Sequence, residues 1–180
     1  MPPPALDEAS SAWVRRFAAL AKPGGAVLDV ACGSGRHLRW LSAQGFKVTG
    51  VDRDEGAVAS LRELAEIVVA DIEGGPWPLP GRRFDALVVT NYLWRPLFPT
   101  LLDSLADSGV LLYETFADGQ QLVGKPSRPE FLLQPGELLQ LCAGLRVVAY
   151  ENGFAHGRYV QRIAVVNGAP GKPEPPRYPL

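Results

Sequence analysis

The sequence predicts an α/β domain in three layers, with helices covering both faces of a doubly wound, mostly parallel sheet. Seven short apolar runs, most of them continuous rather than alternating, indicate strands that are buried on both faces. Helical patterns separate the first five runs, and such alternation requires crossover connections between parallel strands. A Gly-Ser-Gly turn follows the first run. The predicted strands are Ala26–Ala31, Lys47–Val51, Ile67–Ala70, Phe84–Thr90, Val110–Thr115, Leu145–Glu151 and Tyr159–Val166.

Five segments between or before these strands have the pattern of helices. Gly45 ends the second of them, and Asp54 is a suitable N-cap for the third. Pro96 falls in the first turn of the fourth, where a missing backbone N–H costs nothing. The predicted helices are Glu8–Leu20, Arg36–Gln44, Asp54–Ala65, Arg95–Ala106 and Pro135–Cys142.

The last two runs are too close in sequence for a crossover helix. Only Asn152–Arg158 separates them, so we expect an antiparallel hairpin. Two longer segments, Ile72–Arg83 and Ala117–Gln134, show no regular pattern. Long loops in compact domains are commonly functional, and residues 117–134 are a candidate lid.

Composition limits the class of protein. The chain has 180 residues, 47% of them hydrophobic and 21% charged, which suits one globular domain. The net charge of -1 gives no general attraction to nucleic acids or to membrane surfaces. No apolar run reaches the ~18–20 residues of a membrane helix, and the start of the chain does not resemble a signal peptide.

The cysteines, histidines and prolines refine this picture. Two separated cysteines indicate reduced thiols and a cytoplasmic location, and two histidines argue against a zinc site. Prolines crowd both ends of the chain. We therefore predict a single domain over residues 6–168, with short proline-rich tails at residues 1–5 and 169–180.

Polar residues follow the carboxyl ends of the predicted parallel strands, where open α/β sheets bind their ligands. Strand one ends in Gly33-Ser34-Gly35, and glycine lets a backbone approach a ligand closely. Asp52 ends strand two, 19 residues after Gly33, and Asp71 follows strand three, 19 residues after Asp52. Either acid alone could be a helix cap or a solvated strand end. Neither role explains why both Asp52 and Asp71 stand at the ends of consecutive strands.

The chemistry of these acids indicates one kind of ligand. A carboxylate at the end of strand two can accept both hydroxyls of a ribose, as Asp52 is placed to do. Asp71 can accept from an exocyclic amine such as that of adenine. Asp29, four residues before Gly33, can receive an ammonium group directly or through water. Together these groups fit a nucleoside joined to an amino acid.

Five motifs resemble those of the class I S-adenosylmethionine-dependent methyltransferases. They occur in the family's order and cover nearly all of the predicted domain: "VLDVACGSGRH" (27–37), "VTGVDRD" (48–54), "VVADIEG" (68–74), "FDALVVTNYLW" (84–94) and "SGVLLYETF" (108–116). Residues 131–153 further resemble the end of small bacterial methyltransferases of the tellurite-resistance and thiopurine type. The resemblance implies a Rossmann-like sheet of order 3-2-1-4-5-7-6 with an antiparallel seventh strand.

The resemblance also implies that S-adenosyl-L-methionine is the cofactor and assigns residues to its adenosine half. Asp52 would hold the ribose hydroxyls, with Arg53 beside the adenine. Asp71 would accept from the adenine amine, and the backbone N–H of Ile72 would donate to a ring nitrogen.

The same resemblance assigns residues to the amino-acid half of the cofactor. Gly33 and Gly35 would pass close to its methionine part, and Thr90 and Asn91 would face the same end. No metal ligand is implied.

Two rival ligand classes are weaker. A dinucleotide fingerprint needs a third glycine where Leu38 stands, and no lysine is placed as the base of a nicotinamide-dependent reductase. A nucleic-acid methyltransferase commonly has an Asn/Asp-Pro-Pro-aromatic element after strand four, whereas residues 90–93 read Thr-Asn-Tyr-Leu. We therefore expect a small-molecule methyl acceptor rather than nucleic acid or membrane, and a monomer or homodimer. A protein that binds the cofactor without catalysis stays an alternative.

Three residues are candidates for a general base, should the acceptor need one: Tyr92, Glu114 and His156. Each also has a structural interpretation. Tyr92 can simply pack, Glu114 can pair with Arg95, and His156 can be a solvated turn residue. His37, at the start of a predicted helix, is interpreted as a surface or capping histidine.

Overall fold

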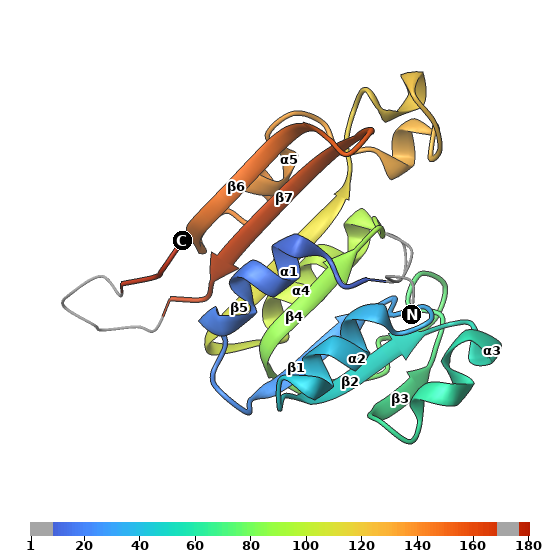
Figure 1. Ribbon diagram of the computed structural model, residues 1–180, viewed down its shortest axis with the longest axis vertical. Helices are drawn as coiled ribbons and strands as arrows, with labels where there is room; N and C mark the ends of the chain where they lie inside the picture. The colour runs from blue at the N-terminus through green and yellow to red at the C-terminus, as the bar shows by residue number, and fades with distance from the viewer. Residues whose placement is uncertain (1–8, 169–176) are drawn as a thin grey trace, which may run out of the picture.

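The computed structural model describes residues 9–168 and 177–180, which form a three-layer α/β structure around one sheet (Figure 1). The sheet has seven strands in the order β3-β2-β1-β4-β5-β7-β6, as the sequence predicted. Strands β1 to β5 pair in parallel, whereas β7 runs antiparallel to β5 and β6. The strands are β1 (Ala26–Val30), β2 (Lys47–Asp52), β3 (Glu66–Val69), β4 (Phe84–Thr90), β5 (Leu105–Phe116), β6 (Arg146–Ala155) and β7 (Arg158–Val166).

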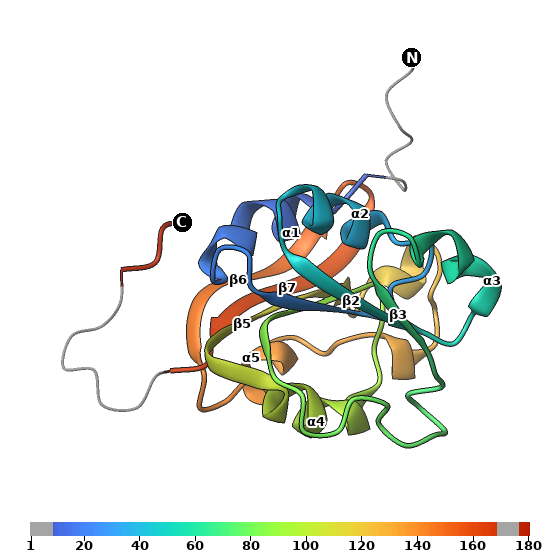
Figure 2. The ribbon, with the colours of Figure 1, turned by 90° about the horizontal axis from the view of Figure 1, so that it is seen from below.

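Helices cover both faces of the sheet (Figure 2). Helices α1 and α2 lie on one face, where their side chains join a buried apolar cluster that includes Trp13 and Leu41. On the other face α4 and α5 pack in a second cluster that includes Phe98 and Leu138. The helices are α1 (Ala12–Phe17), α2 (Arg36–Ala43), α3 (Glu55–Val58), α4 (Phe98–Asp103) and α5 (Glu137–Leu141).

The helices are shorter than predicted because turns of 3₁₀-helix replace part of several of them. Helix α1 begins only after Ser11, whose side chain caps it, and a 3₁₀ turn follows at Ala18–Leu20. The predicted third helix has four α-helical residues, followed by a 3₁₀ turn at Ala59–Leu61. A 3₁₀ turn at Arg95–Leu97 precedes α4, which ends at Asp103 because β5 starts at Leu105.

The hairpin between β6 and β7 is tighter than predicted. Most of residues 152–158 are paired within the hairpin, with Asn152 opposite Gln161 and Gly153 opposite Val160. Only His156 and Gly157 lie between the two strands. Because Phe116 pairs with Val160, the tip of the hairpin lies beyond the carboxyl end of β5.

The two long segments are irregular, as predicted. Residues 117–134 contain only short 3₁₀ turns, Gln120–Leu122 and Pro129–Phe131, and the backbone of Ala117 bridges to Leu133 at their base. The proposed tail at residues 1–5 and most of the one at 169–180 lie outside the described residues. Residues 177–180 form no regular secondary structure, and Tyr178 packs against the cluster beneath α1 and α2.

Candidate cofactor-binding site

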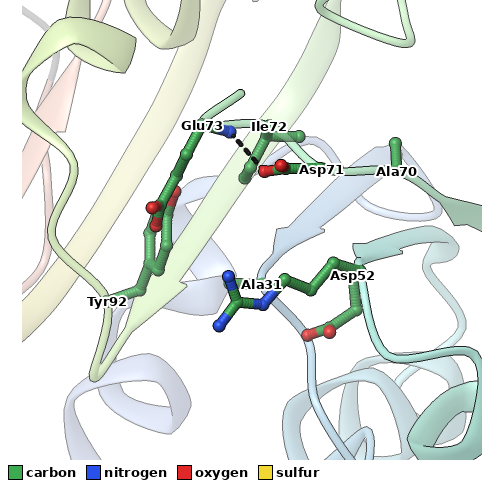
Figure 3. Close-up of a pocket in the computed structure, with 8 residues that line it drawn as sticks. Ala31, Asp52, Ala70, Asp71, Ile72, Glu73 and Tyr92 are labelled. Carbon is green, nitrogen blue, oxygen red and sulfur yellow. Dashed lines mark hydrogen bonds between the residues drawn. The ribbon is translucent and has the colours of Figure 1, made fainter. Parts of the chain in front are cut away.

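The carboxyl ends of four adjacent strands surround one pocket of about 230 Å³ (Figure 3). Its walls come from the residues directly after β1 and β3, from the end of β2, and from the segment after β4. The sheet order brings these segments together, because β1 and β4 are neighbours on one side and β2 and β3 on the other. The lining residues are Ala31, Asp52, Arg53, Ala70, Asp71, Ile72, Glu73 and Tyr92.

Asp52 is held in place by backbone N–H groups. Its Oδ2 accepts a hydrogen bond of 2.7 Å from Gly33 N, and its Oδ1 accepts one of 2.9 Å from Asp54 N. Each carboxylate oxygen has a further lone pair available. The side chain therefore stays able to accept hydroxyl groups from a ligand while its orientation is fixed.

Asp71 forms a tight local turn at the opposite side of the pocket. Its Oδ1 accepts hydrogen bonds from Glu73 N at 3.0 Å and Gly74 N at 3.1 Å. These two bonds lower the pKa of the Asp71 carboxyl, so it is ionised at neutral pH. A Cβ at Gly74 would lie 2.8 Å from Asp71 Oδ2, so a larger residue there would displace the Asp71 carboxylate.

The two glycines of the loop after β1 differ in what surrounds them. Both have positive φ, +52° at Gly33 and +79° at Gly35, which favours glycine. A Cβ on Gly33 would meet no atom within 4 Å, whereas a Cβ on Gly35 would lie 2.5 Å from the Leu61 side chain. Gly33 therefore borders open space, and Gly35 allows the loop to pack against the core.

Asp29 is buried in the middle of the sheet and only partly satisfied. Its side chain is 1% exposed, and Oδ2 has no hydrogen-bond partner. Burial raises the pKa of the Asp29 carboxyl to about 7, opposed by the Leu38 amide and by the charge of Arg36. A buried, unpaired carboxylate oxygen beside the glycine loop suits an incoming cationic group.

Tyr92 contributes a second unpartnered polar atom to the pocket. Its hydroxyl oxygen is buried and forms no hydrogen bond with another residue in the described part of the chain. Burial and the neighbouring Glu73 carboxylate raise the pKa of the Tyr92 phenol well above its ordinary value. The phenol is therefore neutral and able to donate a hydrogen bond to a ligand. In Figure 3 its ring stands beside Glu73 at the edge of the pocket.

Thr90 and Asn91 end β4 beside the glycine loop, but neither lines the pocket. Asn91 has a positive φ of 53°, as does Ala31 directly after β1. Asparagine tolerates this conformation better than alanine, so the strain at Ala31 is the more unusual feature. Nothing in the sequence signals it.

His37 is buried, so its interpretation as a surface or capping histidine was wrong. Its side chain is 2% exposed. Nε2 accepts a hydrogen bond of 3.1 Å from Ser11 N, which leaves the proton on Nδ1, 3.4 Å from Thr90 Oγ1. Burial and the Arg36 charge lower the pKa of the His37 imidazole to about 3. This neutral histidine joins the start of α1 to the end of β4.

Glu114 is paired, but not with Arg95. Its Oε2 accepts from Arg162 Nε in a short ion pair on the neighbouring strand β7, and its Oε1 accepts from Ser11 Oγ at 2.8 Å. Arg95 instead pairs with Glu137 at the start of α5. The expected Glu114–Arg95 pair is therefore incorrect, because β5 and β7 place Glu114 opposite Arg162.

The remaining candidate base stands apart from the pocket. His156 is exposed at the tip of the β6–β7 hairpin, with a positive φ of 52°, and it does not line the pocket. Conversely, Glu73 lines the pocket without having been singled out in the sequence. The only signal for it was its position two residues after Asp71.

The described residues fit the adenosyl amino acid that the sequence suggested. The pocket carries two carboxylates at strand ends, and unpartnered buried oxygens of Asp29 and Tyr92 lie in or near it. Within residues 9–168 and 177–180, no group of three or more His, Cys, Asp or Glu side chains is arranged to hold a metal ion. In the same part of the chain no helix has both the length and the apolar character needed to cross a bilayer.

The fold is that of methyltransferases with a seven-stranded Rossmann-like sheet. Residues 27–108 match the family described as a methyltransferase domain. The search of curated proteins gave no significant match.

Several solved structures share the fold. TehB from Haemophilus influenzae is 20% identical with a TM-score of 0.70, and the match covers 86% of this chain but only 61% of TehB. A TehB-like S-adenosylmethionine-dependent methyltransferase from Corynebacterium glutamicum is 21% identical, with 86% of each chain covered and a TM-score of 0.65. Such an enzyme from Methanosarcina mazei is 14% identical, with 89% and 99% covered and a TM-score of 0.68.

The family match over residues 27–108 and the sheet order support the predicted resemblance to the class I S-adenosylmethionine-dependent methyltransferases. A methyltransferase domain indicates an enzyme with S-adenosyl-L-methionine as its cofactor. The sequence prediction of fold, enzyme type and cofactor is thereby confirmed.

Proposed function

We propose that this enzyme transfers the methyl group of S-adenosyl-L-methionine to a small-molecule acceptor that needs no general base. The observation that carries the proposal is the pocket at the ends of β1 to β4, which Asp52 and Asp71 line from opposite sides. The acceptor would meet the cofactor at the methionine end, beside the glycine loop and Tyr92.

The adenosine half would be bound by the residues that line the pocket. Asp52 accepts from the ribose hydroxyls with the lone pairs that Gly33 N and Asp54 N leave free. Asp71 accepts from the adenine amine, and Ile72 N donates to a ring nitrogen. Arg53 also lines the pocket, so its guanidinium can stack on the base.

The amino-acid half would lie against the loop after β1. Gly33 borders open space, so its backbone can approach the ligand without a side chain in between. The buried Oδ2 of Asp29 receives the ammonium group, directly or through a water molecule. Thr90, Asn91 and Gly35 shape the same end of the site.

The chain's own contribution to catalysis is placement. When bound, S-adenosyl-L-methionine would supply an electrophilic methyl group on a sulfonium, with the neutral thioether as leaving group. In-line placement of this methyl group and the acceptor is worth up to ~7–11 kcal/mol in favourable cases. The Tyr92 phenol, neutral and unpartnered, can donate one hydrogen bond to the acceptor or to the cofactor.

None of the three candidate bases is well suited to remove a proton. The pKa of Tyr92 is raised, so its phenolate is unavailable near neutral pH. Glu114 is occupied by Arg162 and Ser11. His156 is exposed at a hairpin tip outside the pocket. This pattern favours an acceptor that is nucleophilic without help, such as a thiolate or a similar soft atom, over an alcohol.

Three finer properties stay proposals. The Thr-Asn-Tyr-Leu sequence at residues 90–93, without the prolines common in nucleic-acid methyltransferases, favours a small acceptor over nucleic acid. Both cysteines are buried and unpaired, which supports a reducing compartment such as the cytoplasm. We keep a monomer or homodimer as the assembly.

Transfer of tritiated methyl from S-adenosylmethionine into a fractionated metabolite pool tests the proposal. We expect label in a small-molecule fraction, enriched in thiols. Calorimetric titrations with S-adenosylhomocysteine and with NADH accompany the labelling experiment, because a reductase would bind NADH rather than S-adenosylhomocysteine. Binding of S-adenosylhomocysteine without label in any fraction would favour a cofactor-binding protein without catalysis and overturn the proposal.

A further inference from the structure

A groove lined by three arginine side chains lies beside the glycine loop. It has a volume of about 640 Å³ and is walled by α1, by the residues that precede it, and by the start of α2. Figures 1 and 2 show α1 and α2 on the same face of the sheet. The lining residues are Ala9, Ser10, Arg15, Ser34, Arg36, Arg39 and Trp40.

None of the described residues that line this groove is a carboxylate. Among the hydrogen bonds within the described part of the chain, Arg36 donates to the carbonyl oxygen of Ala9 at 3.4 Å, and Arg39 donates to Ser34 O at 3.4 Å and Ser60 Oγ at 3.5 Å. These are long contacts to neutral oxygens. Among the described residues, neither these two arginines nor Arg15 forms an ion pair. Three like charges gathered in a groove whose described lining has no carboxylate repel one another, and an anion would relieve that repulsion.

The groove is chemically distinct from the cofactor pocket, although one loop contributes to both. Ala31 lines the pocket and Ser34 lines the groove. The pocket contains three carboxylates, whereas the groove contains none. The two cavities therefore select ligand groups of opposite charge.

We propose that the groove is a binding site for the phosphate group of a small molecule. Guanidinium groups bind phosphate oxygens in pairs, with more geometric specificity than an ammonium provides. The hydroxyls of Ser10 and Ser34 add donors, and the half-buried Trp40 adds an indole surface for the rest of the ligand. The proposal stands on the groove alone and does not require the identity of the methyl acceptor.

Calorimetric titration of the full chain with pyrophosphate, at constant ionic strength, tests this site. The test variant is Arg15→Gln with Arg39→Gln, which leaves Arg36 in place because its charge acts on Asp29 and His37. The matched control is Lys47→Gln with Arg146→Gln, which removes two exposed positive charges outside the groove. Each protein is also titrated when saturated with S-adenosylhomocysteine.

We expect one pyrophosphate per chain, with affinity reduced at least about tenfold in the test variant and changed less than about twofold in the control. Saturation with S-adenosylhomocysteine should leave this binding in place. Equal losses in both variants would show general charge attraction. Abolition by S-adenosylhomocysteine would show that the groove holds the cofactor's own carboxylate. Either result, or no binding by the native chain, overturns the proposal.

The same titration does not tell whether the phosphate belongs to the methyl acceptor or to a separate effector. Phosphatase treatment of the metabolite pool before tritium labelling separates the two. Loss of label after treatment assigns the phosphate to the acceptor. Label that persists, together with pyrophosphate binding, assigns it to an effector.

Discussion

The backbone N–H of Gly33 donates a hydrogen bond of 2.7 Å to Oδ2 of Asp52. The bond ties the loop after β1 to the end of β2, so that the two segments expected to bind the halves of the cofactor hold one another in place. A second bond, from Asp54 N to Oδ1, fixes the same carboxylate from the other side. The site is thus organised by the chain itself.

The glycine loop gives a first prediction, in which two neighbouring glycines behave differently. Gly35→Ala should lower the free energy of unfolding by about 2–5 kcal/mol, because it adds left-handed strain to a 2.5 Å contact with Leu61. Gly33→Ala should cost about 1–2 kcal/mol for strain alone. Gly33→Ala should, however, weaken binding of S-adenosylhomocysteine, because the added methyl group would enter the open space that the ligand is expected to occupy. Urea unfolding and calorimetry measure the two effects, and equal destabilisation by both variants would contradict this.

Asp29 predicts that cofactor binding is linked to proton release. The pKa of its buried carboxyl is about 7, so the carboxyl is largely protonated at pH 6 and must ionise to receive an ammonium group. The affinity for S-adenosylhomocysteine should rise by up to about tenfold per pH unit between pH 5 and 7 and level off above. Calorimetry at pH 6 in buffers of different ionisation enthalpy should show release of a proton. In Asp29→Asn this release should vanish; its persistence would exclude Asp29 as the source.

His37 predicts a loss of stability in acid. Because its folded pKa, about 3, lies below the ordinary value of 6.5, the unfolded chain binds the extra proton between these values. Its contribution to stability is complete above pH 6.5 and declines as the pH falls. The difference in unfolding free energy between the native chain and His37→Gln should shrink by about 2 kcal/mol from pH 7 to pH 5. Urea unfolding at both pH values measures it, and a constant difference would mean that His37 accepts a proton in the folded protein.

The pair of Glu114 and Arg162 predicts energetic coupling between β5 and β7. Both side chains are largely buried, so removing either leaves the other without its partner. Glu114→Gln and Arg162→Gln should each cost about 3 kcal/mol, and the double variant clearly less than their sum. Glu151→Gln, which removes the more exposed partner of Arg162, serves as control and should cost less than about 1 kcal/mol. Additive losses would indicate that the two side chains are not coupled.

The strand ends show which features of the site could be predicted. We could predict that Asp52 and Asp71 line the same pocket because the carboxyl ends of parallel strands lie at one edge of a sheet. Residues that follow such strands in the sequence are therefore close in space. Inner strands such as β1 and β4 were likewise predictable, because their continuous apolar character reflects burial on both faces, whereas the edge strands β3 and β6 are more exposed. The length of helix α3 was overestimated. Its segment has the apolar spacing of a helix, but a 3₁₀ turn replaces the α-helix after Val58.

The contacts of Glu114 and His37 show what could not be predicted. Glu114 meets Arg162 only through the register of β5 against β7, 48 residues apart, which no local pattern fixes. His37 is buried because Ser11, at the start of α1, passes over it and donates its amide. Both contacts depend on the packing of an element distant in sequence, which spacing alone does not reveal.

Binding of S-adenosylhomocysteine to the native chain, to Asp52→Ala and to Asp54→Ala is the most direct test of the central claim, because Asp54 lies next to the pocket without lining it. We predict saturable binding by the native chain. Asp52→Ala should bind at least about tenfold more weakly, since charged hydrogen bonds contribute roughly 1.5–3 kcal/mol each. Asp54→Ala should stay within about threefold of the native affinity. No binding by the native chain, or equal affinity in Asp52→Ala, would contradict the assignment of this pocket to the cofactor.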